Sequence, residues 1–77
     1  MQQLLIKWFN PTNGRFYRIY LIQDLAGGLI VRFDYGGTRS NHRRIKDEQV
    51  CSLQEVDERI AAQKVTRARR GYEIDLS

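Results

Sequence analysis

Large hydrophobic residues recur at every second position through most of the first half of the chain, which is the period of a β-strand. Four segments follow this pattern, at residues 4–9, 15–23, 29–35 and 43–50, and the last is the most polar, as suits a sheet edge. Turn-forming residues separate them, with Asn-Pro-Thr-Asn-Gly at 10–14 and Asp-Leu-Ala-Gly-Gly at 24–28. We therefore predict four antiparallel strands.

The second and third predicted strands each have a feature that bears on function. Residues 15–23 carry large side chains on both faces, which predicts a central strand covered on much of both sides. Residues 29–35 end in Tyr35 and are followed by Gly36 and Gly37. Glycine reaches positive φ at no steric cost, so we expect the pair to break the strand and to open a loop over residues 36–42.

From residue 52 the hydrophobic period changes to that of a helix. Ser52 and Glu55 form a capping box, and Gly71 is placed just past the expected helix end. The residues at helical spacing between them are Leu53, Val56, Ile60, Ala61, Val65 and Ala68. The pattern predicts a helix from residue 53 to 69 or 70, and a short closing strand within 72–76. The expected fold is α+β, a single domain over residues 1–77 with a small antiparallel β-sheet of four to five strands and one C-terminal α-helix packed on it.

The composition is that of a soluble globular domain, with 42% hydrophobic and 29% charged residues among 77. The chain has one cysteine and one histidine, so neither a disulfide nor a cluster of such metal ligands is expected within it. The start of the chain lacks the pattern of a signal peptide, and no apolar run approaches the roughly 20 residues of a membrane span. We expect a cytoplasmic protein without a membrane partner.

Residues that could support catalysis are few and isolated. His42 has no acidic neighbour in sequence to orient it, and Cys51 has no base nearby. The glycine pairs lack the spacing and the following lysine of a phosphate-binding P-loop. We therefore expect a protein that is not an enzyme and that uses no cofactor, no metal and no small-molecule substrate.

The positive charge is concentrated in two places. The net charge is +4 and the pI about 9.6, which favours an anionic partner such as nucleic acid. One group, following Tyr35, is Arg39, Arg43, Arg44 and Lys46; the other, preceding Tyr72, is Lys64, Arg67, Arg69 and Arg70. Arginine beside aromatic rings suits phosphate contact combined with stacking. We favour binding for the first group, and for the second we favour a solvated helix end that matches the helix dipole.

Five short motifs occur in a fixed order along the chain. They are Phe-Tyr-Arg-Ile at 16–19, Asp-Leu-Ala-Gly-Gly at 24–28, Val-Arg at 31–32, Ser-Leu-Gln-Glu at 52–55 and Arg-Arg-Gly-Tyr at 69–72. In this order they resemble the WGR domain family, in its bacterial stand-alone form, over residues 5–73. The naming motif is altered, because Tyr35-Gly36-Gly37 stands where that family has Trp-Gly-Arg.

The resemblance implies a small antiparallel sheet with one packed helix. It also implies DNA binding, since WGR domains of poly(ADP-ribose) polymerases contact DNA near a strand break and also contact neighbouring domains. Our first hypothesis is a non-enzymatic DNA-binding module. The residues expected to bind nucleic acid are Arg32, Tyr35, Arg39, Arg43, Arg44 and Lys46. The alternative is a protein–protein interaction or regulatory module without nucleic-acid binding, using an exposed patch of Phe16, Tyr20 and Ile22.

Overall fold

The computed structural model describes residues 2–38 and 42–76. Within them the chain forms one antiparallel sheet and one helix, which confirms the predicted α+β fold. The elements in chain order are β1 (Gln2–Asn10), β2 (Arg15–Gln23), β3 (Leu29–Gly37), β4 (Arg43–Val50), α1 (Leu53–Arg69) and β5 (Glu73–Ile74). No helix in these two ranges is both long and apolar enough to cross a membrane.

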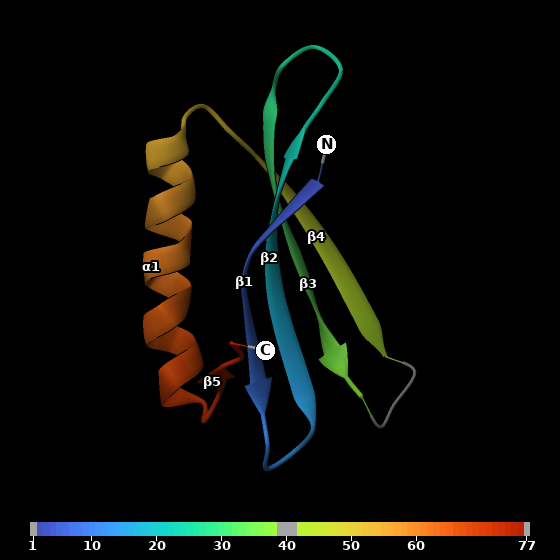
Figure 1. Ribbon diagram of the computed structural model, residues 1–77, viewed down its shortest axis with the longest axis vertical. Helices are drawn as coiled ribbons and strands as arrows, with labels where there is room; N and C mark the ends of the chain where they lie inside the picture. The colour runs from blue at the N-terminus through green and yellow to red at the C-terminus, as the bar shows by residue number, and fades with distance from the viewer. Residues whose placement is uncertain (1, 39–41, 77) are drawn as a thin grey trace.

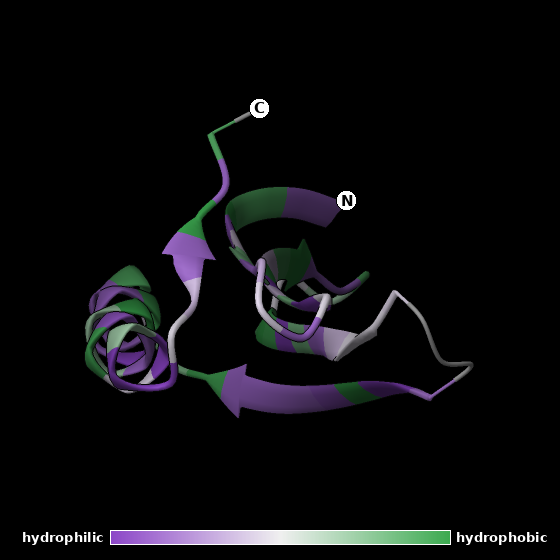
Figure 2. Ribbon diagram, turned by 90° about the horizontal axis from the view of Figure 1, so that it is seen from below, coloured by the Kyte–Doolittle hydropathy of each residue, from purple (hydrophilic) through white to green (hydrophobic). Residues whose placement is uncertain are grey.

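The strands lie in the order β4-β3-β2-β1-β5, so β2 is central as predicted and β4 forms an edge. The short closing strand β5 pairs with β1 through Trp8 and Ile74. Figure 1 shows α1 lying along one side of the sheet, with β5 between the helix end and β1. In the end-on view of Figure 2 the helix stands beside the curved sheet and leaves the other side of the sheet open.

The core lies between α1 and one face of the sheet. The buried hydrophobic residues of that core are Trp8, Tyr17, Ile19, Val31, Phe33, Val50 and Val56. The prediction that β2 is covered on much of both sides is therefore wrong, because the single helix covers only the face of Tyr17 and Ile19. Phe16 and Tyr20 lie on the opposite face, where they are half-buried by their neighbours rather than by a second layer. We call this second side the open face.

The helix presents a different stripe to the sheet from the one expected. Leu53 and Val65 are 61% and 54% exposed, although they belong to the predicted hydrophobic stripe. The residues that face the sheet are Val56, Ile60, Gln63 and Arg67, at helical spacing i, i+4, i+7 and i+11. The first two are apolar and the last two are polar, so close apolar packing stops at the middle of the helix.

Gly36 and Gly37 belong to β3, so the prediction that they break the strand is wrong. Gly36 pairs with Arg43 across to β4, and positive φ among the described glycines occurs only at Gly14, Gly27 and Gly71. A Cβ on Gly36 would collide with the carbonyl oxygen of His42 and lie 3.0 Å from Cα of Arg43. Glycine is therefore needed there for the close approach of β4 and not for a turn.

Candidate nucleic-acid interface

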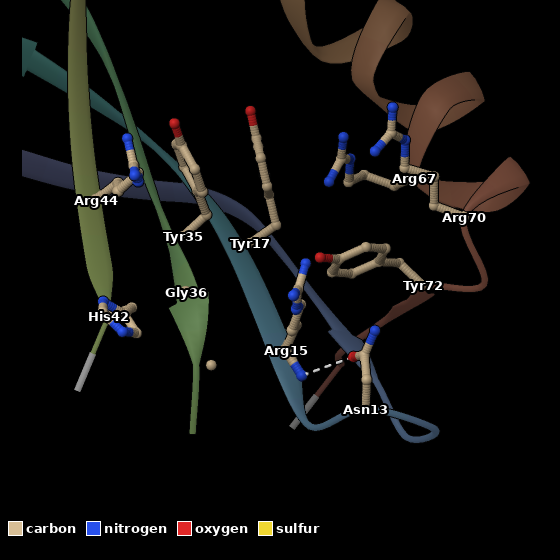
Figure 3. Close-up of a pocket in the computed structure, with 11 residues that line it drawn as sticks. Asn13, Arg15, Tyr17, Tyr35, Gly36, His42, Arg44, Arg67, Arg70 and Tyr72 are labelled. Carbon is tan, nitrogen blue, oxygen red and sulfur yellow. Dashed lines mark hydrogen bonds between the residues drawn. The ribbon is translucent and has the colours of Figure 1, made fainter. Parts of the chain in front are cut away.

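A hollow of about 850 Å³ opens between the C-terminal half of α1 and the sheet, beside the end of β3 and the start of β4. Figure 3 shows its side chains converging from β2, β3, β4 and the helix end. The lining residues are Asn13, Arg15, Tyr17, Tyr35, Gly36, Gly37, His42, Arg44, Arg67, Arg70 and Tyr72. We call this cavity the basic hollow, because four of these residues are arginines and none of them is acidic.

The sheet supplies a row of three side chains to the basic hollow. Tyr17 of β2 is opposite Tyr35 of β3, and Tyr35 is opposite Arg44 of β4. Directly opposite residues in antiparallel strands point to the same face, so all three project toward α1. The two tyrosine rings are stacked, with centroids 5.2 Å apart and planes at 15°. The row therefore consists of two stacked rings followed by one cation, Arg44, next to Tyr35.

The end of α1 supplies the opposite wall through a Schellman motif. The Tyr72 amide donates to the carbonyl oxygen of Arg67 at 2.9 Å, and the Gly71 amide donates to that of Ala68 at 3.2 Å, with φ of +81° at Gly71. This turn brings Tyr72 back against the helix. The Arg67 guanidinium consequently lies 4.3 Å from the ring centroid of Tyr17 and 4.9 Å from that of Tyr72.

Asn10 connects the helix end to the β1–β2 turn. It is 4% exposed, and its Nδ2 donates to the carbonyl oxygen of Arg70 at 3.0 Å. Its Oδ1 accepts from the Thr12 amide at 2.9 Å, while its own carbonyl accepts from the Gly14 amide at 2.8 Å. Thr38, just after β3, donates from both its amide and its hydroxyl to the carbonyl of Gly14. This turn therefore fixes the helix end, β2 and β3 relative to one another.

The electrostatic character of the basic hollow is strongly positive. Its four arginines form no salt bridge with any carboxylate in the part of the chain that the structure describes. Nε of Arg67 is buried and has no hydrogen-bond partner among the described residues. Burial raises the pKa of the Tyr17 phenol, and the nearby charge of Arg67 opposes that rise in part. The hollow thus offers uncompensated donors and aromatic rings to an anion.

The predicted binding residues are divided between the two faces. Tyr35 and Arg44 line the basic hollow, and Lys46 is on the same face but pairs with Glu48, with Nζ and Oε1 3.3 Å apart. Arg32 and Arg43 lie on the open face, because neighbouring residues of a strand point in opposite directions. Arg39 lies outside the described residues.

The two predicted site residues on the open face, Arg32 and Arg43, both form salt bridges with carboxylates. Arg43 donates from Nε and Nη2 to the two oxygens of Asp34, each at 2.7 Å, and Asp34 is 1% exposed. Arg32 donates in the same two-pronged way to Asp47, at 2.8 and 2.9 Å. These hydrogen bonds raise the pKa of both guanidinium groups and lower the pKa of Asp47. The structure therefore does not bring Arg32 and Arg43 together with Tyr35.

Sequence reasoning missed Arg15, Tyr17 and the contribution of the helix end. A signal for Tyr17 was present, because counting outward from the turn at 24–28 places residue 17 opposite residue 35. Arg15 directly follows the turn ending in Gly14, at the same end of the sheet as Gly37, with which it pairs. Arg67 and Arg70 are in the basic group that sequence reasoning assigned to the helix dipole.

Neither a metal-binding cluster among the described residues nor a similar known protein was found. Across residues 2–38 and 42–76, no three or more His, Cys, Asp or Glu side chains are grouped so that they could hold a metal ion. Comparison of the chain with protein-family models, curated proteins and solved structures gave no match.

Proposed function

We propose that this protein is a non-enzymatic, WGR-like module that binds DNA through the phosphate backbone in the basic hollow. The observation that carries the proposal is the convergence of Arg15, Arg44, Arg67 and Arg70, none of them paired with a carboxylate in the described chain, around three tyrosines. Guanidinium groups form two-pronged, charge-assisted hydrogen bonds with phosphate, and tyrosine rings stack on sugars and bases.

The proposed site keeps two of the residues predicted from the sequence and adds others. Tyr35 and Arg44 remain, and the charge contributed by the second strand and the helix end replaces that of Arg32 and Arg43. The resemblance to WGR domains supports the same proposal, since that family includes modules that contact DNA. The lining side chains supply hydrogen-bond donors, cations and aromatic rings, which are the groups that bind a phosphate backbone and its sugars and bases. A bacterial, cytoplasmic setting would give the protein access to DNA.

The proposal is tested with Arg44→Ala combined with Arg70→Ala, measured by fluorescence anisotropy on labelled DNA over a range of salt concentrations. Both residues are exposed, so the double variant is expected to fold. The wild type should bind at low salt with a dissociation constant of about 100 µM or tighter. The slope of log affinity against log salt should fall in magnitude by about 2 in the double variant, because two phosphate contacts are lost.

Lys64→Ala combined with Arg69→Ala provides the matched control. It removes the same net charge from two exposed residues of α1, and neither residue lines the basic hollow. If both double variants lose affinity equally, binding depends on overall charge and the proposed site is wrong. If the wild type binds neither duplex nor single-stranded DNA at low salt, DNA binding itself is wrong.

A further inference from the structure

A second, smaller cavity continues from the basic hollow beneath α1. It measures about 150 Å³ and shares Tyr17 and Tyr35 with the basic hollow. The rest of its lining is Phe33, Lys46, Glu48 and Gln63. We call it the small hollow. We call the two hollows together the combined cavity. The basic hollow contributes arginines and tyrosines to it, and the small hollow contributes Phe33, Gln63 and the Lys46–Glu48 ion pair.

The small hollow lies where the sheet-facing stripe of the helix becomes polar. Apolar packing ends at Ile60, and Gln63 and Arg67 follow at the next inward positions. Gln63 Oε1 and Arg67 Nε are both buried and have no hydrogen-bond partner within the described residues. Buried polar atoms in proteins are nearly always hydrogen-bonded, so these two, one helical turn apart, are available to a polar group of a ligand or to water in the cavity.

The aromatic row has one unoccupied ring face toward the same cavity. One face of Tyr17 stacks on Tyr35, and the Arg67 guanidinium also lies over the Tyr17 ring. Tyr35 stacks on Tyr17 on one side, and no other ring or guanidinium of the described chain lies over it. Figure 3 shows Arg44 rising from β4 on that other side of Tyr35. Arg44 is directly opposite Tyr35, so a flat group would stack on Tyr35 once the exposed Arg44 side chain turns aside, and it would then lie beside a cation.

We infer that the combined cavity accepts an unpaired nucleotide, so that the preferred ligand is single-stranded nucleic acid or a frayed end rather than an intact duplex. The base would stack on Tyr35 and reach toward Gln63, and the flanking phosphates would contact the arginines of the basic hollow. The inference rests on the proposed function and names the form of nucleic acid that the site takes.

Size and chemistry both favour an unpaired base. A volume of about 850 Å³ is in the range of sites that bind small ligands. In a duplex the ring faces are stacked and the pairing edge is used, so neither is free for Tyr35 or Gln63. A base outside the duplex presents both, and proteins read such bases by stacking together with hydrogen bonds.

The test compares an intact oligodeoxynucleotide with the same strand carrying abasic residues, which keeps every phosphate and removes the bases. The wild-type protein should bind the intact strand at least about fivefold more tightly, which is the lower end of the contribution of one stacked base. It should also prefer the intact strand to a blunt duplex of equal length. Equal affinity for intact and abasic strands would mean that water fills the small hollow, and would overturn the inference while the proposed function stands.

Two variants assign the preference to the cavity. Tyr35→Leu should reduce the ratio of intact to abasic affinity to within about twofold, because the stacking face is lost. Tyr20→Leu makes the same change on the open face and should leave the ratio unchanged. The ratio is measured on one protein preparation, so partial unfolding cancels from it. A Tyr35→Leu variant that keeps the wild-type ratio would overturn the inference.

An oligoribonucleotide of the same sequence shows whether the unpaired nucleotide that the protein binds comes from DNA or from RNA. The proposed function requires the deoxy strand to bind at least as tightly as the ribo strand. Tighter binding of the ribo strand would support the unpaired-nucleotide inference and would overturn DNA as the ligand. Absence of binding to any strand, intact or abasic, would overturn the proposed function and the inference together.

Discussion

The two faces of the sheet both carry arginines, but only those of the open face are neutralised within the described chain. On the open face, Arg43 and Arg18 approach the buried carboxylate of Asp34, and Arg32 is bound by Asp47. On the helix side, the arginines of the basic hollow have aromatic rings as neighbours instead. The comparison separates arginines that stabilise the fold from arginines that are available to a ligand, although both kinds alternate along the same strand.

The difference follows from where the acidic residues lie. Asp34 and Asp47 occupy open-face positions of β3 and β4, directly across from or next to open-face cations. Among the described residues, none that lines the basic hollow is acidic. Glu48 lines the adjacent small hollow, where it forms ion pairs with Lys46 and Arg59. Net charge alone would not separate the two faces.

The largest effect is expected for Asp34→Ala on the open face. It removes two charge-assisted hydrogen bonds to a carboxylate that is 1% exposed, so the free energy of unfolding should fall by about 2 kcal/mol. Urea unfolding measures this loss. DNA affinity, measured where the variant is folded, should not fall, because Asp34 and its partners face away from the basic hollow. A loss of affinity would show that the open face takes part in binding.

A smaller effect is expected for Gly36→Ala, at the place where β3 closely approaches the start of β4. The added Cβ meets backbone atoms of His42 and Arg43, so the start of β4 must move, at a cost of about 1 kcal/mol in the free energy of unfolding. Arg44 is carried with it, and DNA affinity should fall as well. Unchanged affinity with reduced stability would show that the position of Arg44 is not critical for binding.

The smallest effect is expected for Asp47→Asn, and it depends on pH. The hydrogen bond from Arg32 lowers the pKa of Asp47, so the ionised carboxylate stabilises the folded state above the ordinary carboxyl value. That stabilisation is lost as the pH falls through the lowered pKa. The thermal midpoints of the variant and the wild type should therefore differ slightly at neutral pH and converge in acid. Both side chains of this pair are substantially exposed, so added salt should also shrink the difference.

Local sequence signals were enough to predict most of the fold. Alternation placed the four main strands, Asn13-Gly14 marked the first turn, and Ser52 with Glu55 marked the helix start that the structure shows. The helix stripe was predicted incorrectly because Gln63 and Arg67, both polar, occupy the inward positions. Hydrophobicity alone selects the wrong side of a helix where that helix borders a cavity.

The candidate site was less predictable, because its parts are distant in sequence. Strand alternation already implies that Arg43 and Arg44 point to opposite faces, so the basic segment could have been divided from the sequence alone. The meeting of Arg44 with Arg67 depends instead on the path of α1 back along the sheet. No local pattern encodes that path, which contacts distant in sequence hold, among them the packing of Val56 and the hydrogen bond from Asn10.

The turn at residues 10–14 has a consequence for how such a protein could diverge. It holds the helix end through Asn10 and the end of β3 through Gly14, and it leads directly into Arg15. Neither Val56 nor Ile19 belongs to this turn, so a one-residue insertion there would act first on the spacing between the cations. Ligand preference could then change between related proteins without any substitution at a residue that contacts the ligand. Comparing the length of this turn among such proteins would reveal that change.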